Sequence, residues 1–179
     1  MRRTLVSPCA PIFSHRGGGH FLGVIVDRIR EIVNRTIVPS LISGPFDKRL
    51  LHAVSGLASE IGEFQAAKAG FGPPRMSHLE AADVLWFAAE LHGLLPGEMQ
   101  IGPPASLNLA SARFFGAVQK YARGDERYPD LSVAKARLGD LIEATARESL
   151  PREELTDILE RKLEARLKAG TIRGDGDLR

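Results

Sequence analysis

Apolar residues recur at helical spacing through most of this chain, and this period limits the possible folds more than any other feature. It appears in six stretches, namely residues 22–35, 47–69, 77–94, 106–122, 132–149 and 151–169. The stretch 77–94 is apolar on nearly every side, which is typical of a central, buried helix. No stretch has the pattern of a convincing β-strand. We therefore predict an all-α fold, a bundle of about six helices.

Several predicted helix ends carry recognisable signals. Gly70 and the glycines and prolines after it should end the second helix. Ser77 with Glu80 three residues later has the pattern of a capping box, and Ser132 is a candidate N-cap. Pro151 suits the first position of the last helix.

We expect three parts in the chain. Residues 1–20 should form a flexible N-terminal extension, 21–170 an all-α domain, and 171–179 a flexible C-terminal tail. Residues 95–106 are the clearest linker inside the domain.

The overall composition excludes some classes of protein. The formal net charge of +2 is too even to indicate nucleic-acid binding. The chain contains a single cysteine, which favours a reduced, cytoplasmic setting. No apolar run approaches the roughly 20 residues of a membrane span. We therefore expect neither a nucleic-acid nor a membrane partner.

Two apolar helical stretches each carry a pair of acids at the same spacing. Glu60 and Glu63 lie in the second stretch, and Glu80 and Asp83 lie in the third. Residues three apart on a helix project from one face. Each pair should therefore present two carboxylates in one direction.

Two explanations of these acids stay open. Glutamates on helices are usually solvated, and Glu90 could extend such a wet stripe. If the faces are buried instead, four uncompensated carboxylates would be prohibitively costly, and divalent cations would offset them. Mg²⁺ prefers hard oxygen ligands of this kind, and Mn²⁺ is an alternative. Small neighbours such as Gly56 and Gly62 indicate close packing or close approach.

Histidine does not support a different metal chemistry. A di-iron bundle site uses glutamate with histidine three residues later, and the sequence contains no such pair. His78 lies two residues before Glu80 and should face another direction, and we interpret His52 and His92 as packing or surface residues.

The second half of the chain weakly echoes the first. Asp140 corresponds to Asp83, whereas Arg137 replaces Glu80, and Ala112 and Gly116 lie near the other acidic positions. A decayed duplication and chance similarity between Ala- and Leu-rich helices both explain this echo.

The acidic motif resembles that of a known family. "LLHAVSGLASEIGEF", a 16-residue gap after Glu63, then "LEAADVLWFAAEL" is similar to the all-α nucleoside triphosphate pyrophosphohydrolases of the MazG-like type. The C-terminal "KLEARLKAGTIRGDGD" also resembles the tail of many members. The resemblance covers residues 48–94 and 155–177.

This resemblance implies roles for particular residues. Glu60, Glu63, Glu80 and Asp83 would be both the catalytic acids and the Mg²⁺ ligands. A phosphate-contacting lysine would correspond to Lys162.

Arg166 and Lys168 are further candidates for substrate binding, although a solvated basic helix end is the favoured explanation for both. Two positions depart from the family pattern. Ser59 stands where many members have another glutamate, and Leu159 stands where asparagine is common.

The implied activity is Mg²⁺-dependent hydrolysis of a nucleoside triphosphate between its α- and β-phosphates, giving a nucleoside monophosphate and pyrophosphate. Members of this family are usually homodimers or homotetramers, so we expect the same here. The alternative is a non-catalytic nucleotide-binding or protein-interaction module that kept the helical bundle.

Overall fold

The computed structural model describes residues 27–33, 35, 46–73 and 76–169. Residues 27–33 are helical, and five longer helices follow them: α3 (Phe46–Lys68), α4 (Met76–Leu94), α5 (Leu107–Ala122), α6 (Ser132–Glu148) and α7 (Arg152–Lys168). These parts contain no strand, so the predicted all-α class is confirmed. The predicted flexible segments 1–20 and 171–179 lie outside the described residues.

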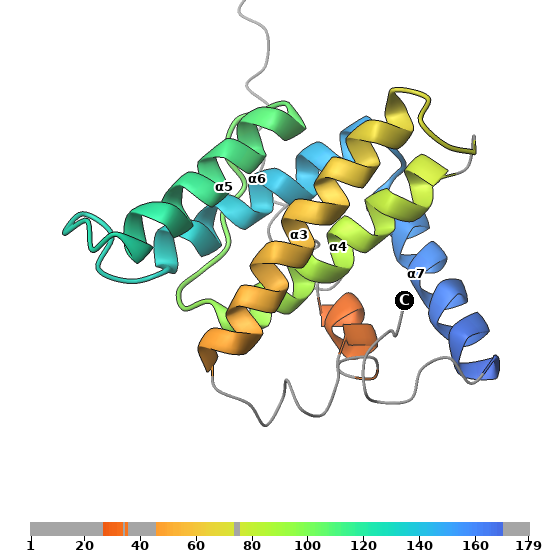
Figure 1. Ribbon diagram of the computed structural model, residues 1–179, viewed down its shortest axis with the longest axis horizontal. Coiled ribbons are helices and arrows are strands. Elements are labelled where there is room, and N and C mark those ends of the chain that lie inside the picture. The colour runs from red at the N-terminus through yellow and green to blue at the C-terminus, as the bar shows by residue number, and fades with distance from the viewer. Residues whose placement is uncertain (1–26, 34, 36–45, 74–75, 170–179) are drawn as a thin grey trace, which may run out of the picture.

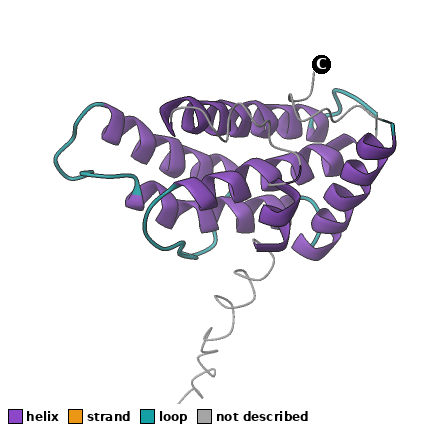
Figure 2. Cartoon of the chain, turned by 90° about the horizontal axis from the view of Figure 1, so that it is seen from below, coloured by secondary structure: helices purple, strands orange, loops and turns teal. Residues whose placement is uncertain are grey.

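The helices are arranged as two hairpins and a crossing helix (Figure 1). Helix α3 packs along α4, and α5 packs along α6. Helix α4 also contacts α6 and α7, and it is therefore the centre of the molecule. Figure 2 shows the same helices from below.

The burial of α4 explains this central position. Its side chains pack on three neighbouring helices, as the sequence predicted for a stretch that is apolar on nearly every side. Nine of its residues are buried, including two acids, Glu80 and Glu90. None of the described helices is both long enough and apolar enough to cross a membrane.

The start of α4 differs from the prediction. Helix α4 begins at Met76, so Ser77 lies within its first turn instead of capping it. Glu80, the predicted partner of Ser77 in a capping box, is buried.

The starts of α6 and α7 also differ. Ser132 does not cap α6, because the Asp130 carboxylate accepts the Ser132 backbone N–H at 2.8 Å. Pro151 precedes α7, and its carbonyl accepts the Leu155 backbone N–H at 3.1 Å. In both cases the stabilising group lies just before the helix.

The two glycines of α3 have different environments. A β-carbon built on Gly56 would lie 2.1 Å from the Phe87 ring, so this glycine lets α3 and α4 approach closely. Gly62 is exposed, and a β-carbon there would meet nothing within 4 Å. The prediction of close packing or close approach therefore holds for Gly56 and is wrong for Gly62.

Candidate functional site

The register between α3 and α4 brings the two acidic pairs together. Arg49 near the start of α3 contacts Glu90 near the end of α4, and Gly56 faces Phe87 in between. The two helices are therefore antiparallel. The two acidic pairs begin about one turn beyond this contact, after Gly56 on α3 and before Phe87 on α4.

Three of the four predicted acids form a compact cluster. Glu60, Glu63 and Glu80 each offer one carboxylate oxygen, and these oxygens all lie within 4.8 Å of one another. Glu60 and Glu80 are buried, with 4% and 8% exposure, and Glu63 is half-buried. These three acids therefore do not form an ordinary solvated stripe.

The cluster changes the acidity of Glu80. Burial is the main cause that raises the pKa of Glu80, and the nearby charges of Asp83 and Glu63 raise it further. The positive charge of Lys162 and a hydrogen bond with Glu60 act in the opposite direction. Glu80 is thus a carboxyl group in a crowded, partly desolvated acidic environment.

The fourth acid, Asp83, has a different neighbour. Its carboxylate forms an ion pair with the ammonium group of Lys162 from α7. Both side chains are partly buried. A third helix therefore reaches the acids, and it does so through the lysine for which the family resemblance implies a phosphate contact.

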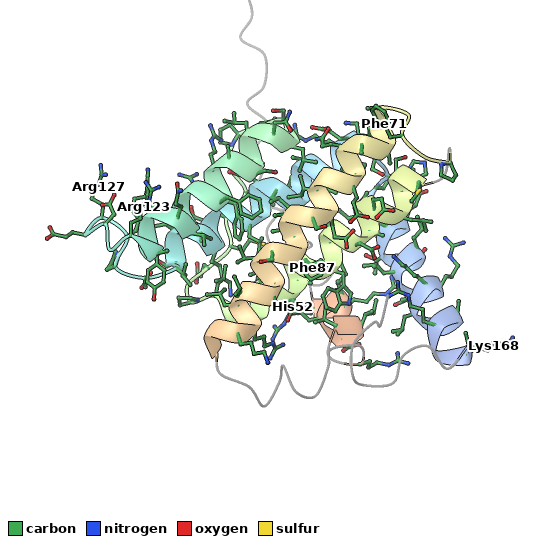
Figure 3. All side chains as sticks on the ribbon, in the orientation of Figure 1. His52, Phe71, Phe87, Arg123, Arg127 and Lys168 are labelled. Atoms are coloured by element: carbon green, nitrogen blue, oxygen red, sulfur yellow. The ribbon has the colours of Figure 1, made fainter. Side chains whose placement is uncertain are left out.

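The other predicted basic residues lie further along α7. Arg166 is one turn beyond Lys162, and Lys168 belongs to the last turn, about 9 Å along the helix axis from Lys162. Figure 3 shows Lys168 at the far end of this helix. A contact of either residue with substrate stays a prediction.

The two departures from the family pattern have structural consequences. The Ser59 hydroxyl donates a hydrogen bond to Glu63 Oε1 at 3.1 Å. Ser59 therefore orients one acid of the cluster and adds no charge of its own. Leu159 is 3% exposed and belongs to the hydrophobic core, so no polar group stands at that position.

Helices α3 and α4 also contact each other at a distance from the acidic cluster. There the contact consists of aromatic side chains and a second ion pair. His52 and Phe87 lie side by side, with ring centroids 5.7 Å apart (Figure 3). Beyond them, Arg49 Nε donates to Glu90 Oε1 at 3.4 Å. Glu90 is 2% exposed, so the explanation of Glu90 as part of a wet stripe is wrong.

The three histidines among the described residues take no part in the acidic cluster. The ring Nδ1 of His78 lies 3.1 Å from the Ser149 hydroxyl, and His52 packs against Phe87. His92 is half-buried near the end of α4, and burial is the main cause that lowers its pKa to about 4. These contacts agree with the interpretation of His52 and His92 as packing or surface residues.

The region of the predicted second repeat carries no equivalent cluster among the described residues. Asp140 is buried, and its Oδ1 accepts the Gly102 backbone N–H at 2.6 Å. This contact attaches the 95–106 linker to α6. Asp140 therefore has a structural partner where Asp83 has Lys162, and the origin of the echo by duplication stays a prediction.

The donor set suits a hard divalent cation. Glu60, Glu63 and Glu80 present only oxygen atoms, which Mg²⁺ and Mn²⁺ favour over the softer ligands that zinc or copper prefer. A cation there would also offset the repulsion between the carboxylates. Asp83 lies outside this group, and its Oδ2 is paired with Lys162.

Comparison with known proteins adds no identification to this geometry. No family model, curated protein sequence or solved structure matches the chain at a significant level.

Proposed function

We propose that the chain is a Mg²⁺-dependent nucleoside triphosphate pyrophosphohydrolase that cleaves between the α- and β-phosphates. The observation that carries this proposal is the convergence of Glu60, Glu63 and Glu80 from two packed helices, with their oxygens within 4.8 Å of one another. The sequence resemblance supplies the reaction class. The proposed setting is cytoplasmic removal of unwanted nucleotides by a homodimer or homotetramer.

The chemistry follows from the properties of the site. A bound Mg²⁺ would supply charge neutralisation for the triphosphate and a lower pKa for a coordinated water. Glu60, Glu63 and Asp83 would hold the cation, and Glu80 would hold it or orient the attacking water. Lys162 lies beside the acids and donates to a phosphate oxygen.

A pyrophosphate-release screen over canonical and modified nucleoside triphosphates, with and without Mg²⁺, tests the activity. We expect at least one nucleotide to be hydrolysed and the release to require the metal. Glu63→Gln should lower the rate by roughly 100-fold or more, because it removes one charged metal ligand. The matched control is Glu98→Gln, since Glu98 is an exposed glutamate of the linker.

Circular dichroism of Glu63→Gln must show helicity close to that of the parent. A folded Glu63→Gln variant that releases pyrophosphate as fast as the parent would show that the cluster is not the active site. Absence of release from every nucleotide in the parent would contradict the activity itself.

A non-catalytic binding module is the second candidate, and a specific observation favours it. Leu159 fills a core position where asparagine is common in the family, so the chain lacks that polar contact to a nucleotide. Ser59 likewise contributes a hydroxyl group instead of a carboxylate. Calorimetry separates the candidates, because a binding module would bind nucleotide or a protein partner with no pyrophosphate formed.

A further inference from the structure

The two halves of α3 are packed into the bundle to different degrees. The first half is residues 46–55, and among residues 48–55 only Ala53 is buried, while Leu51 is 67% exposed. The second half, residues 57–68, has four buried side chains, namely Leu57, Glu60, Ile61 and Phe64. A segment with few buried apolar contacts opens locally at a small cost in free energy, while the rest of the protein stays folded. The first half of α3 is therefore the part of this helix that opens most readily.

The polar contacts of α3 show the same contrast. In the second half, Lys68 forms an ion pair with Glu148 of α6. Among the described residues, the first half has one ion pair with another of the five longer helices, and it joins Arg49 to Glu90 of α4. A Ser–Gly pair at positions 55 and 56 separates the halves, and such pairs are among the places where helices bend.

The contact with Arg49 satisfies the Glu90 carboxyl group poorly. The Glu90 side chain is inaccessible, yet Arg49 Nε lies 3.4 Å from its Oε1, and Oε2 has no hydrogen-bond partner among the described residues. An ionised carboxylate in this position lacks the hydrogen bonds that would offset its lost hydration. A protonated carboxyl group carries no charge, so burial costs it much less.

The geometry points to a proton-controlled opening at this end of the bundle, in which the first half of α3 stays on α4 while Glu90 is protonated and opens when Glu90 ionises. Opening removes Arg49 and lets water reach the carboxylate. Burial gives the same sign, because it is the main cause that raises the pKa of Glu90 to about 7, and Arg49 only partly opposes it. This response to pH needs neither a metal nor a nucleotide, so it goes beyond the proposed function and does not depend on it.

Charged groups from α6 and from residues 27–33 act on a different residue of α4. Three of them act on the pKa of His92, namely Asp27, Arg30 and Lys135. Burial is the main cause that lowers this pKa to about 4, so His92 stays neutral above pH 6. These groups therefore do not produce a response near pH 7.

The remaining charged and titratable groups near this contact belong to α7 and α3. From α7, Lys162 pairs with Asp83, about two turns before Glu90. On α3, His52 lies one turn after Arg49, and burial lowers its pKa. Arg49 is the charged group that acts on the pKa of Glu90. Glu90→Gln keeps all of these groups and removes only the carboxyl group, so it isolates the effect.

Hydrogen exchange measured by mass spectrometry tests the proposal on the full chain. Exchange rates of peptides from each half of α3 are divided by the intrinsic rates at each pH, which gives the protection of that half. In the parent, protection of residues 46–55 should fall about tenfold between pH 6 and pH 8.5, because the acid has a pKa of about 7 when buried and 4.5 when hydrated. The fall should level off above pH 7, and protection of residues 57–68 should stay nearly constant.

Two variants isolate the carboxyl group of Glu90. Glu90→Gln carries no charge at either pH, so the protection of residues 46–55 should be the same at both. Glu98→Gln removes an exposed glutamate of the linker and should behave as the parent does. Circular dichroism establishes that both variants are folded.

Three results would overturn the inference. They are an equal fall in Glu90→Gln and the parent, constant protection of residues 46–55 in the parent, and an equal fall in both halves of α3. The last two are read from the parent alone and do not depend on the folding of a variant. Pyrophosphate release does not enter the measurement, so the proposed function stands or fails separately.

Discussion

Glu90 shows how strongly burial alters a single ionisable residue in this bundle. Its side chain is inaccessible, Arg49 is its ion-pair partner, and Oε2 has no hydrogen-bond partner among the described residues. Burial is the main cause that raises the pKa of Glu90 from 4.5 to about 7, and Arg49 only partly opposes it. The folded state therefore favours the protonated acid.

The raised pKa of Glu90 has a definite effect on stability. The contribution of Glu90 to the free energy of unfolding is fully present below about pH 4.5 and is lost as the pH rises through about 7. The reason is that the folded state holds the proton of Glu90 more tightly than the unfolded chain does. Glu90→Gln should therefore match the parent near pH 4 and exceed its free energy of unfolding by roughly 3 kcal/mol at pH 8. Denaturant unfolding at both pH values measures this difference.

The pH dependence of the parent's free energy of unfolding would not by itself isolate the contribution of Glu90. The pKa of His92 is lowered from 6.5 to about 4, so its contribution is present above pH 6.5 and is lost as the pH falls toward 4. The two residues act with opposite signs over much of the same range. Glu98→Gln is the control, and an equal gap between Glu90→Gln and the parent at both pH values would contradict the assignment.

At the scale of elements, the spacing between α3 and α4 depends on one glycine. The Phe87 ring occupies the space above Gly56, between the acidic cluster and the Arg49–Glu90 pair. This contact sets the distance between the helices that carry the acids. Close approach of α3 and α4 is therefore part of how the site is built.

Alanine substitutions at the two α3 glycines should have opposite effects. Gly56→Ala places a methyl group against the Phe87 ring and should lower the free energy of unfolding by about 1–3 kcal/mol. Gly62→Ala meets nothing and should raise it by about 0.5–1 kcal/mol, because alanine restricts the unfolded chain and favours helix. Chemical denaturation of both variants measures the pair, and stabilisation by Gly56→Ala would show that α3 and α4 are not in close contact there.

At the scale of the whole molecule, a buried lysine joins the two hairpins. Lys135 of α6 donates from Nζ to the His92 carbonyl at 2.6 Å and to the Leu95 carbonyl at 3.0 Å. It thereby satisfies carbonyl groups at the end of α4, where a positive charge also complements the helix dipole. Burial is the main cause that lowers the pKa of Lys135.

Removal of this lysine should weaken the entire bundle. Lys135→Met leaves the two carbonyl groups without their charged donor and should lower the free energy of unfolding by about 2 kcal/mol. For a chain of this size the melting temperature should fall by about 4–8 °C. Calorimetry of Lys135→Met beside Lys48→Met, a control at an exposed lysine of α3, measures the effect. Equal melting temperatures would show that the hydrogen bonds of Lys135 contribute nothing to stability.

Helical periodicity alone determined the all-α class, the approximate extents of α3 to α7 and the central place of α4, because spacing along a helix decides which residues share a face. It also placed Glu60 and Glu63 on one face of α3, and Glu80 and Asp83 on one face of α4. Only the tertiary structure decided that three of these acids meet while Asp83 pairs with Lys162, since this depends on the register of α3 against α4 and on the crossing of α7. The burial of Glu90 and the hydrogen bond from the Ser132 backbone N–H to Asp130 were likewise beyond sequence reasoning, because each depends on a neighbour that local periodicity does not specify.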